Sequence, residues 1–445
     1  MNKRVKILVI SLIITLTSST IFAQHLLRSE FIPYNMRTDA TTRTRSDSTQ
    51  YAPFNPTRMD EVGGRILLTQ DFDLPYEWSA GRTYIHLENL GLAHSLIING
   101  SEVAYTDDPL TPAEYNISKY LHQGVNQIAI AVNDPLYPEL QEGVAADQRP
   151  TRERLENCYL FAQRRRDIHD YSARIYPDST GMFARLEVIA VVENGYNFEE
   201  SIEVSFDIYD PKGKLVDYST REVTIEGRSR DSVIFNSYVY NADVNRWSVS
   251  NPALYEVTLM TKSSGVVRSY LPMKVAYMDR EYRGGELYNF GKKVSLKSKR
   301  YNATSSKEQS AKELAAIKKS GVNTLRPDYP QPLWYYELAD AMGLFVVEQI
   351  NINAPSSADD RSLGGTPSNN PKLLNNYIER AEKSYYRVKN HPSVVAFSMG
   401  GDSGNGYNMY KTYEWFKGVE PIRPIIYGDT AGEWNSDRLK IIGVQ

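Results

Sequence analysis

Residues 394–406 read Val-Val-Ala-Phe-Ser-Met-Gly-Gly-Asp-Ser-Gly-Asn-Gly, and this stretch decides the fold class. An apolar strand runs directly into a polar, glycine-rich turn that carries a single carboxylate, Asp402. In an α/β barrel, the loops at the carboxyl ends of the strands hold the reactive side chains. The stretch is therefore typical of a barrel strand that is followed by a catalytic acid.

The segments around this stretch alternate between helical and strand patterns. The helix that begins at Ser306 has a capping-box pattern with Gln309, and Gly321 lies just past its end. The patterns predict helices over 306–320, 334–342, 373–389 and 407–417, and strands over 294–297, 322–325, 344–348, 394–399, 424–427 and 439–444. Such alternation indicates a parallel sheet with right-handed crossovers. Since eight strands close a TIM barrel, we expect an incomplete (β/α)8 barrel of about six strands and a truncated chain.

Residues 60–275 have a different pattern, with short alternating runs separated by turn residues. Asn99-Gly100 is a strong hairpin signal between two such runs, and residues 124–132 form another alternating run. A second block of strand patterns starts near Ala184. Short strands at this spacing predict two successive β-sandwiches.

The N-terminus has the pattern of an export signal. Three basic residues precede an apolar stretch over 7–22, and Ala23 stands before Gln24. This pattern predicts a signal peptide over residues 1–23 and no stable membrane span after cleavage, with an uncleaved anchor as the alternative. Residues 24–59 are polar and lack periodicity, and this composition predicts an N-terminal arm or linker.

The composition limits the cellular compartments and the classes of binding partner that we expect for this protein. The chain of 445 residues is 41% apolar, which suits two to four globular domains. Its net charge is −3 and its basic residues are dispersed apart from residues 164–166, so we expect no nucleic-acid partner. Cys158 is the only cysteine, which excludes an intramolecular disulfide and favours the periplasm or cell surface of a Gram-negative bacterium. The oligomeric state is not predicted.

Characteristic motifs follow one another from about residue 62 to the C-terminus. Besides the 394–406 stretch, they include Tyr84-Ile-His-Leu-Glu-Asn, Trp247-Ser-Val-Ser-Asn-Pro-Ala-Leu-Tyr255, Gly-Val-Asn-Thr-Leu-Arg-Pro-Asp-Tyr-Pro at 321–330 and Gly-Leu-Phe-Val-Val-Glu at 343–348. In this order the motifs resemble glycoside hydrolase family 2, the β-galactosidase and β-glucuronidase family. The resemblance implies a jelly-roll, sugar-binding-like domain over 60–180, an immunoglobulin-like β-sandwich over 181–280 and a partial TIM barrel over 281–445.

The resemblance also implies hydrolysis of β-glycosidic bonds with retention, which needs two carboxyl groups about 5–5.5 Å apart. Asp402 stands at the acid/base position, where the family has Glu, and Gly401 stands where the family has Asn. The shorter acid and the lost Asn contact imply weak catalysis. The Arg of a family motif is kept as Arg326, whereas Asp328 and Asn302 stand at positions of family His residues.

Further positions follow from the same resemblance. Glu348 matches a family Glu at the end of the third strand, and Trp434 lies on the loop after the fifth strand, on the active face. The family ligands for a divalent cation align near Asn353 and Pro355, so we expect no metal at this site, and no cofactor. The nucleophile belongs to a seventh strand, which the sequence does not contain.

Non-catalytic interpretations remain open for these residues. Asp402 beside glycines is also a common turn residue, and Arg326 with Glu348 would make a structural ion pair inside the sheet. Aromatic residues pack more often than they bind sugars, and packing is the alternative for three tryptophans, Trp334, Trp415 and Trp434.

These features predict an exported relative of retaining β-galactosidases that act on terminal β-linked sugars of glycans, with impaired or no catalysis. The alternative is a non-catalytic carbohydrate-binding or surface-assembly protein that keeps the jelly roll for recognition. Both hypotheses expect a β-linked glycan as the partner. Activity on nitrophenyl β-galactoside or β-glucuronide above that of an Asp402→Ala control would contradict the first hypothesis. The second hypothesis expects glycan affinity that does not depend on Asp402.

Overall fold

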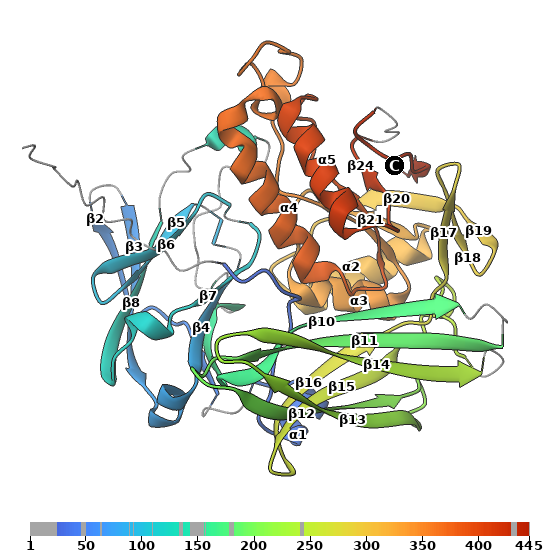
Figure 1. Ribbon diagram of the computed structural model, residues 1–445. Helices are drawn as coiled ribbons and strands as arrows, with labels where there is room; N and C mark the ends of the chain where they lie inside the picture. Colours follow the sequence, from blue (N-terminus) through green and yellow to red (C-terminus); the bar gives the residue numbers. More distant parts are fainter. Residues whose placement is uncertain are drawn as a thin grey trace, which may run out of the picture.

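The strand and helix patterns fold into three parts that follow one another along the chain (Figure 1). The structure is a computed structural model, and it describes residues 25–45, 50–62, 65–88, 90–91, 93–108, 110–132, 137–142, 155, 157–177, 182–240, 244–428 and 434–444. The expected signal peptide, residues 1–23, lies outside the described residues. Among those residues, no helix is long and apolar enough to cross a membrane.

The first part is a β-sandwich of a four-stranded sheet, in the order β1-β9-β4-β7, and a five-stranded sheet, in the order β2-β3-β8-β5-β6. Apolar residues such as Ile85 and Leu96 fill the space between the sheets. The hairpin predicted at Asn99-Gly100 is confirmed, because φ is +50° and +78° at these residues and they join β5 to β6. The strands are β1 (Tyr51–Pro53), β2 (Arg58–Val62), β3 (Arg65–Leu74), β4 (Arg82–Leu87), β5 (His94–Ile98), β6 (Ser101–Thr106), β7 (Ala113–Asn116), β8 (Gly124–Val132) and β9 (Tyr159–Gln163).

The second part is an immunoglobulin-like sandwich with sheets in the orders β10-β11-β14 and β13-β12-β15-β16. Every second residue of β11 is buried, which places Val188 and its neighbours in a core with Phe206. The strands are β10 (Arg166–Pro177), β11 (Phe183–Asn194), β12 (Glu200–Tyr209), β13 (Leu215–Ile225), β14 (Arg230–Tyr240), β15 (Tyr255–Ser263) and β16 (Val266–Val275). Because β10 pairs with β11 from Arg166 onward, this sandwich begins near residue 166 rather than at the expected residue 181.

The third part is a parallel sheet of six strands, in the order β24-β23-β22-β21-β20-β25, with helices packed against it. Ser306 accepts a hydrogen bond from the Gln309 amide (3.2 Å), so the predicted cap of α2 is confirmed. The elements are β20 (Leu296–Arg300), α2 (Lys307–Lys319), β21 (Thr324–Arg326), α3 (Leu333–Met342), β22 (Phe345–Gln349), α4 (Leu374–Val388), β23 (Val394–Ser398), α5 (Tyr407–Val419), β24 (Ile425–Ile426) and β25 (Ile441–Gly443). A small antiparallel sheet precedes them, with strands β17 (Arg280–Arg283), β18 (Glu286–Asn289) and β19 (Lys292–Val294).

The last strand takes an unexpected place in this sheet. The sequence predicts 439–444 as the sixth barrel strand, which would lie beside the fifth. Instead, β25 pairs in parallel with the first strand, with Leu296 opposite Ile441. In a closed eight-stranded barrel the last strand neighbours the first, so β25 covers the edge of β20 that would otherwise be unpaired. The result is an incomplete barrel, as predicted, with a different order of strands.

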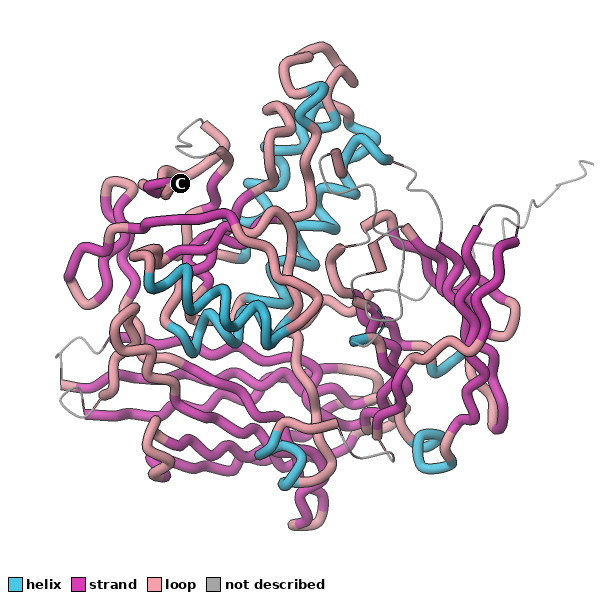
Figure 2. Tube along the Cα trace, turned by 180° about the vertical axis from the view of Figure 1, so that it is seen from behind, coloured by secondary structure: helices cyan, strands magenta, loops and turns pink. Residues whose placement is uncertain are grey.

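Residues 25–45 form an arm that runs between the three parts. Arg28 pairs with Glu114 of the first sandwich (2.8 Å), and the amide of Ser29 donates to Asp170 of the second (2.9 Å). Glu30 pairs with Arg387 of α4 in the third part (2.6 Å). The arm then forms the short helix α1 (Arg37–Thr42). Figure 2 shows α1 as a short helix beside the strands of the second sandwich. The arm is therefore an integral part of the packing.

Candidate active site at the carboxyl edge of the parallel sheet

Polar side chains gather at the carboxyl ends of four neighbouring strands. Asn302 follows β20, Asp328 follows β21, Gln349 ends β22 and Asp402 follows β23. Because the strands are parallel, their carboxyl ends lie along one edge of the sheet. In α/β barrels this edge carries the active site, so the arrangement defines a candidate active site.

Asn302 and Asp328 bond directly to each other at this edge. Asn302 Nδ2 donates to Asp328 Oδ2 (2.9 Å), and the Asp328 amide donates to Asn302 Oδ1 (2.8 Å). Gln349 Nε2 donates to the carbonyl oxygen of Asp328 (2.7 Å) and ties this pair to β22. The two positions that the resemblance assigns to histidines therefore hold a mutually satisfied amide and carboxylate.

Asp402 is exposed, and its carboxylate has no hydrogen bond or ion pair with any residue that the structure describes. The turn around it is held by other groups. The Ala354 amide donates to the carbonyl oxygen of Asp402 (2.8 Å), and the Ser403 amide donates to the hydroxyl of Tyr427 (3.0 Å). Within the part of the chain that the structure describes, the turn is thus held by groups other than this carboxylate.

Gly401 lies against Asn353, the position where the resemblance places a family metal ligand. A Cβ atom on residue 401 would come within 2.3 Å of Asn353 Oδ1. The side chain of Asn353 therefore fills the space that an asparagine at position 401 would need. Asn353 Nδ2 also donates to the carbonyl oxygen of Glu142, and Pro355 starts a 3-10 turn, so these residues do not fit a divalent cation.

The structure corrects the substrate-binding role expected of Glu348. This side chain is fully buried and faces the helices, where Tyr336 of α3 and Ser384 of α4 donate hydrogen bonds to its two oxygens (2.7 and 2.8 Å). Burial outweighs these bonds and the nearby Arg387 charge, and it raises the pKa of Glu348 to about 7. Glu348 bonds to these hydroxyls rather than to Arg326, so the ion-pair alternative does not hold either.

Arg326 and the three tryptophans, the other residues considered for substrate binding, differ in how exposed they are to solvent. Arg326 ends β21 and is half-buried, and its carbonyl oxygen accepts from the Tyr301 amide. Trp434 is 70% exposed and packs against Tyr410 of α5, with ring centres 4.9 Å apart. Trp334 and Trp415 pack against the core beneath the helices, as the alternative interpretation expected.

The first sandwich supplies residues that the sequence did not indicate. Gln141 forms a β-bridge with Asn353, and Asn351 Nδ2 donates to Asp108 Oδ1 (2.7 Å). In the sequence, Gln349, Asn351 and Asn353 alternate with two isoleucines, which are buried in the structure. This alternation indicates that the segment has one polar face. The partners from the first sandwich lie more than 200 residues away, so no local pattern could identify them.

Comparison with known proteins identifies the class to which this architecture belongs. Residues 32–168 match the sugar binding domain of glycosyl hydrolases family 2, residues 167–270 match the middle domain of that family, and residues 297–443 match its TIM barrel domain. The three matches follow the three parts of the structure in order. The chain belongs to glycoside hydrolase family 2.

Individual relatives agree with this assignment. The chain is 26% identical over 398 residues to a β-galactosidase of Priestia megaterium, and 26% identical over 395 residues to one of Oenococcus oeni. Each alignment covers 84% of this chain and 37% of the relative, so the chain spans less than half the length of these relatives.

Solved structures show the same fold. Bacteroides uniformis β-glucuronidase 2, covalently bound to cyclophellitol-6-carboxylate aziridine, superposes with a TM-score of 0.69 over 91% of this chain and 52% of that chain, at 17% identity. A family 2 member from Bacteroides cellulosilyticus gives a TM-score of 0.68 over 84% of this chain and 51% of that chain, also at 17% identity.

Proposed function

We propose that this protein is an exported, β-galactosidase-like member of its family that engages terminal β-linked sugars of glycans, and that its hydrolytic activity is impaired. The observation that carries the proposal is the position of Asp402. An exposed carboxylate stands after the fourth strand, at the edge where barrel enzymes bind substrate. The pattern of residues 1–23 supports export to the periplasm or cell surface.

Three local features support impaired hydrolysis. Asp402 is one methylene shorter than the glutamate of the family motif, and a misplacement of about 1 Å can cost about 100-fold in rate. Gly401 offers no side-chain amide to a sugar hydroxyl, and Asn353 fills the space beside it. Asn302 and Asp328 satisfy each other, so they are poorly placed to replace the histidines of the family.

Hydrolysis of nitrophenyl β-galactoside and nitrophenyl β-glucuronide by the full chain tests this proposal. We expect a slow rate at most, and we expect Asp402→Ala to abolish whatever rate is present. Asn375→Ala, on the exposed side of α4, serves as a matched surface control. Fast turnover by the wild type, whether Asp402→Ala keeps it or loses it, would contradict the proposal.

A second candidate function is glycan binding without catalysis. Support comes from the first sandwich, which has both of its sheets and matches the sugar binding domain of the family over residues 32–168. Titration of the full chain and of Asp402→Ala against a panel of β-linked oligosaccharides tests this function. Equal affinity of the two proteins for one glycan would support it, and a flat response to the whole panel would exclude it.

A further inference from the structure

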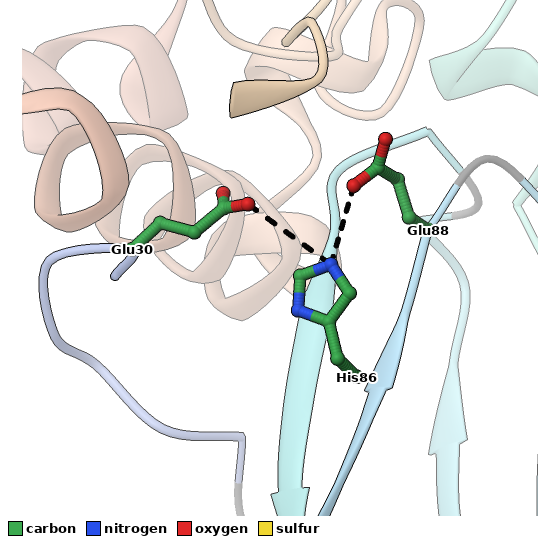
Figure 3. Close-up of side chains that lie close together, drawn as sticks. All are labelled: Glu30, His86 and Glu88. Carbon is green, nitrogen blue, oxygen red and sulfur yellow. Dashed lines mark hydrogen bonds and ion pairs between the residues drawn. The ribbon is translucent and has the colours of Figure 1, made fainter. Parts of the chain in front are cut away.

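Three side chains of metal-ligand type meet where the N-terminal arm crosses the first sandwich (Figure 3). Glu30 lies on the arm, His86 lies on β4, and Glu88 is the residue that follows β4. His86 Nε2 lies 3.2 Å from Glu88 Oε2 and 4.0 Å from Glu30 Oε1. The three side chains are at most 8% exposed. None of these three residues belongs to the candidate active site.

Each group of the cluster has its other polar atom bonded to a neighbour. The contacts are Arg387 Nε to Glu30 Oε2 (2.7 Å), Asn157 Nδ2 to Glu88 Oε1 (3.3 Å) and His86 Nδ1 to Glu114 Oε1 (3.4 Å). They leave one oxygen of each cluster glutamate facing the Nε2 atom of the histidine. A histidine whose second nitrogen bonds a carboxylate is the usual arrangement of a metal-ligating histidine, because that bond fixes the tautomer and the ring orientation.

The spacing of the three atoms that face one another suits a small four-coordinate ion. Bonds of about 2.0–2.1 Å in a tetrahedron place neighbouring ligand atoms about 3.3 Å apart. The distance of 3.2 Å from Nε2 to Glu88 meets this value, and the oxygen of Glu30, at 4.0 Å, would need to approach by about 0.7 Å. All three residues line a cavity of about 900 Å³ that has room for water.

We propose that Glu30, His86 and Glu88 bind one divalent metal ion, with a water molecule from the cavity as the fourth ligand. An imidazole with two carboxylates matches Zn²⁺ better than the all-oxygen set preferred by Mg²⁺ or Ca²⁺. The ion would join the arm to β4, and it would reach α4 through the pairing of Glu30 with Arg387. Its role is therefore to fasten the arm among the three parts of the fold.

Calorimetric titration of the full chain with Zn²⁺ tests the proposal, after treatment with EDTA and without a histidine tag. We expect one Zn²⁺ per chain with micromolar affinity or tighter, and a response to Mg²⁺ at least 100-fold weaker. Hydrogen exchange should slow at the arm amides of residues 26–32 when Zn²⁺ is added, because Glu30 becomes a ligand.

Glu88→Gln removes one anionic ligand while it keeps the volume and an acceptor for Asn157. We expect this variant to bind Zn²⁺ about 100-fold more weakly, with its fold checked by circular dichroism. Glu222→Gln, at an exposed position of β13, is the matched control and should bind as the wild type does. No binding of Zn²⁺ by the wild type, or equal binding by the wild type and Glu88→Gln, would overturn the proposal.

Discussion

Asn302 and Asp328, 26 residues apart, share two hydrogen bonds of 2.9 and 2.8 Å across the carboxyl ends of β20 and β21. Asn302→Ala removes both bonds and leaves a half-exposed carboxylate. We expect the free energy of unfolding to fall by about 1–2 kcal/mol, because each bond contributes about 1 kcal/mol. Urea denaturation measures the change, with the surface variant Asn375→Ala as control. Equal stability of the two variants would show that this pair does not hold the edge.

The side chain of Asn353 occupies the space that a side chain at position 401 would need. Gly401→Asn introduces a Cβ atom 2.3 Å from Asn353 Oδ1, so Asn353 must move and lose its bond to Glu142. We expect a loss of about 1–3 kcal/mol in stability. In an Asn353→Ala background the same substitution should cost at least about 1 kcal/mol less, which is a double-mutant coupling. The cycle compares the wild type, Gly401→Asn, Asn353→Ala and the double variant. If the two substitutions change the free energy of unfolding additively, the side chains at positions 401 and 353 do not compete for the same space.

Among the residues that the structure describes, none bonds to the carboxylate of Asp402, so we expect that this carboxylate does not hold its own turn. Asp402→Ala should change the free energy of unfolding by no more than about 0.5 kcal/mol, the range of ordinary surface substitutions. Ser403→Ala is the informative comparison, because the buried Ser403 hydroxyl accepts from the Ala354 amide (3.1 Å). Its loss should cost about 0.5–1.5 kcal/mol, because the Ala354 amide keeps its bond to the carbonyl oxygen of Asp402. A larger loss of stability in Asp402→Ala than in Ser403→Ala would support the interpretation that Asp402 stabilises the turn.

Glu348 makes stability depend on pH. Its folded pKa of about 7 exceeds the ordinary value of 4.5, so the folded state holds a proton that the unfolded state releases. The stabilising contribution is fully present below pH 4.5 and is lost as the pH rises to 7, by up to about 3 kcal/mol. Denaturation of Glu348→Gln and wild type at pH 5 and pH 8 should show the variant gaining relative stability at pH 8. A constant difference between the two proteins would contradict this.

Cys158 should be unreactive in the folded protein. Burial raises the pKa of its thiol to about 12, and Sγ contacts the backbone of Glu88 at 3.3 and 3.4 Å. Because the thiolate is the nucleophile, labelling by a disulfide reagent at pH 8 should follow the rate of unfolding. The same reagent should label denatured protein within seconds. Rapid labelling under native conditions would mean that the loop around Cys158 opens locally.

The sequence alone predicted the elements that depend on neighbouring residues. The Asn99-Gly100 hairpin, the Ser306 cap and the alternating burial of β11 follow from local turn geometry, capping and the period of two in a strand. The same reasoning placed Asp402 at the carboxyl edge of the parallel sheet, because a strand pattern ended there. Sequence motifs also indicated the family, which the domain matches then established.

Only the tertiary structure decided which residues meet. Periodicity does not show which face of β22 the helices cover, so the orientation of Glu348 came from packing. Nor does it show which edge a terminal strand joins, and β25 pairs with the first strand rather than the fifth. Glu30 and His86 meet because the arm crosses the first sandwich. Such contacts depend on how separate elements bury their apolar faces against one another, a property of the whole chain that no local segment specifies.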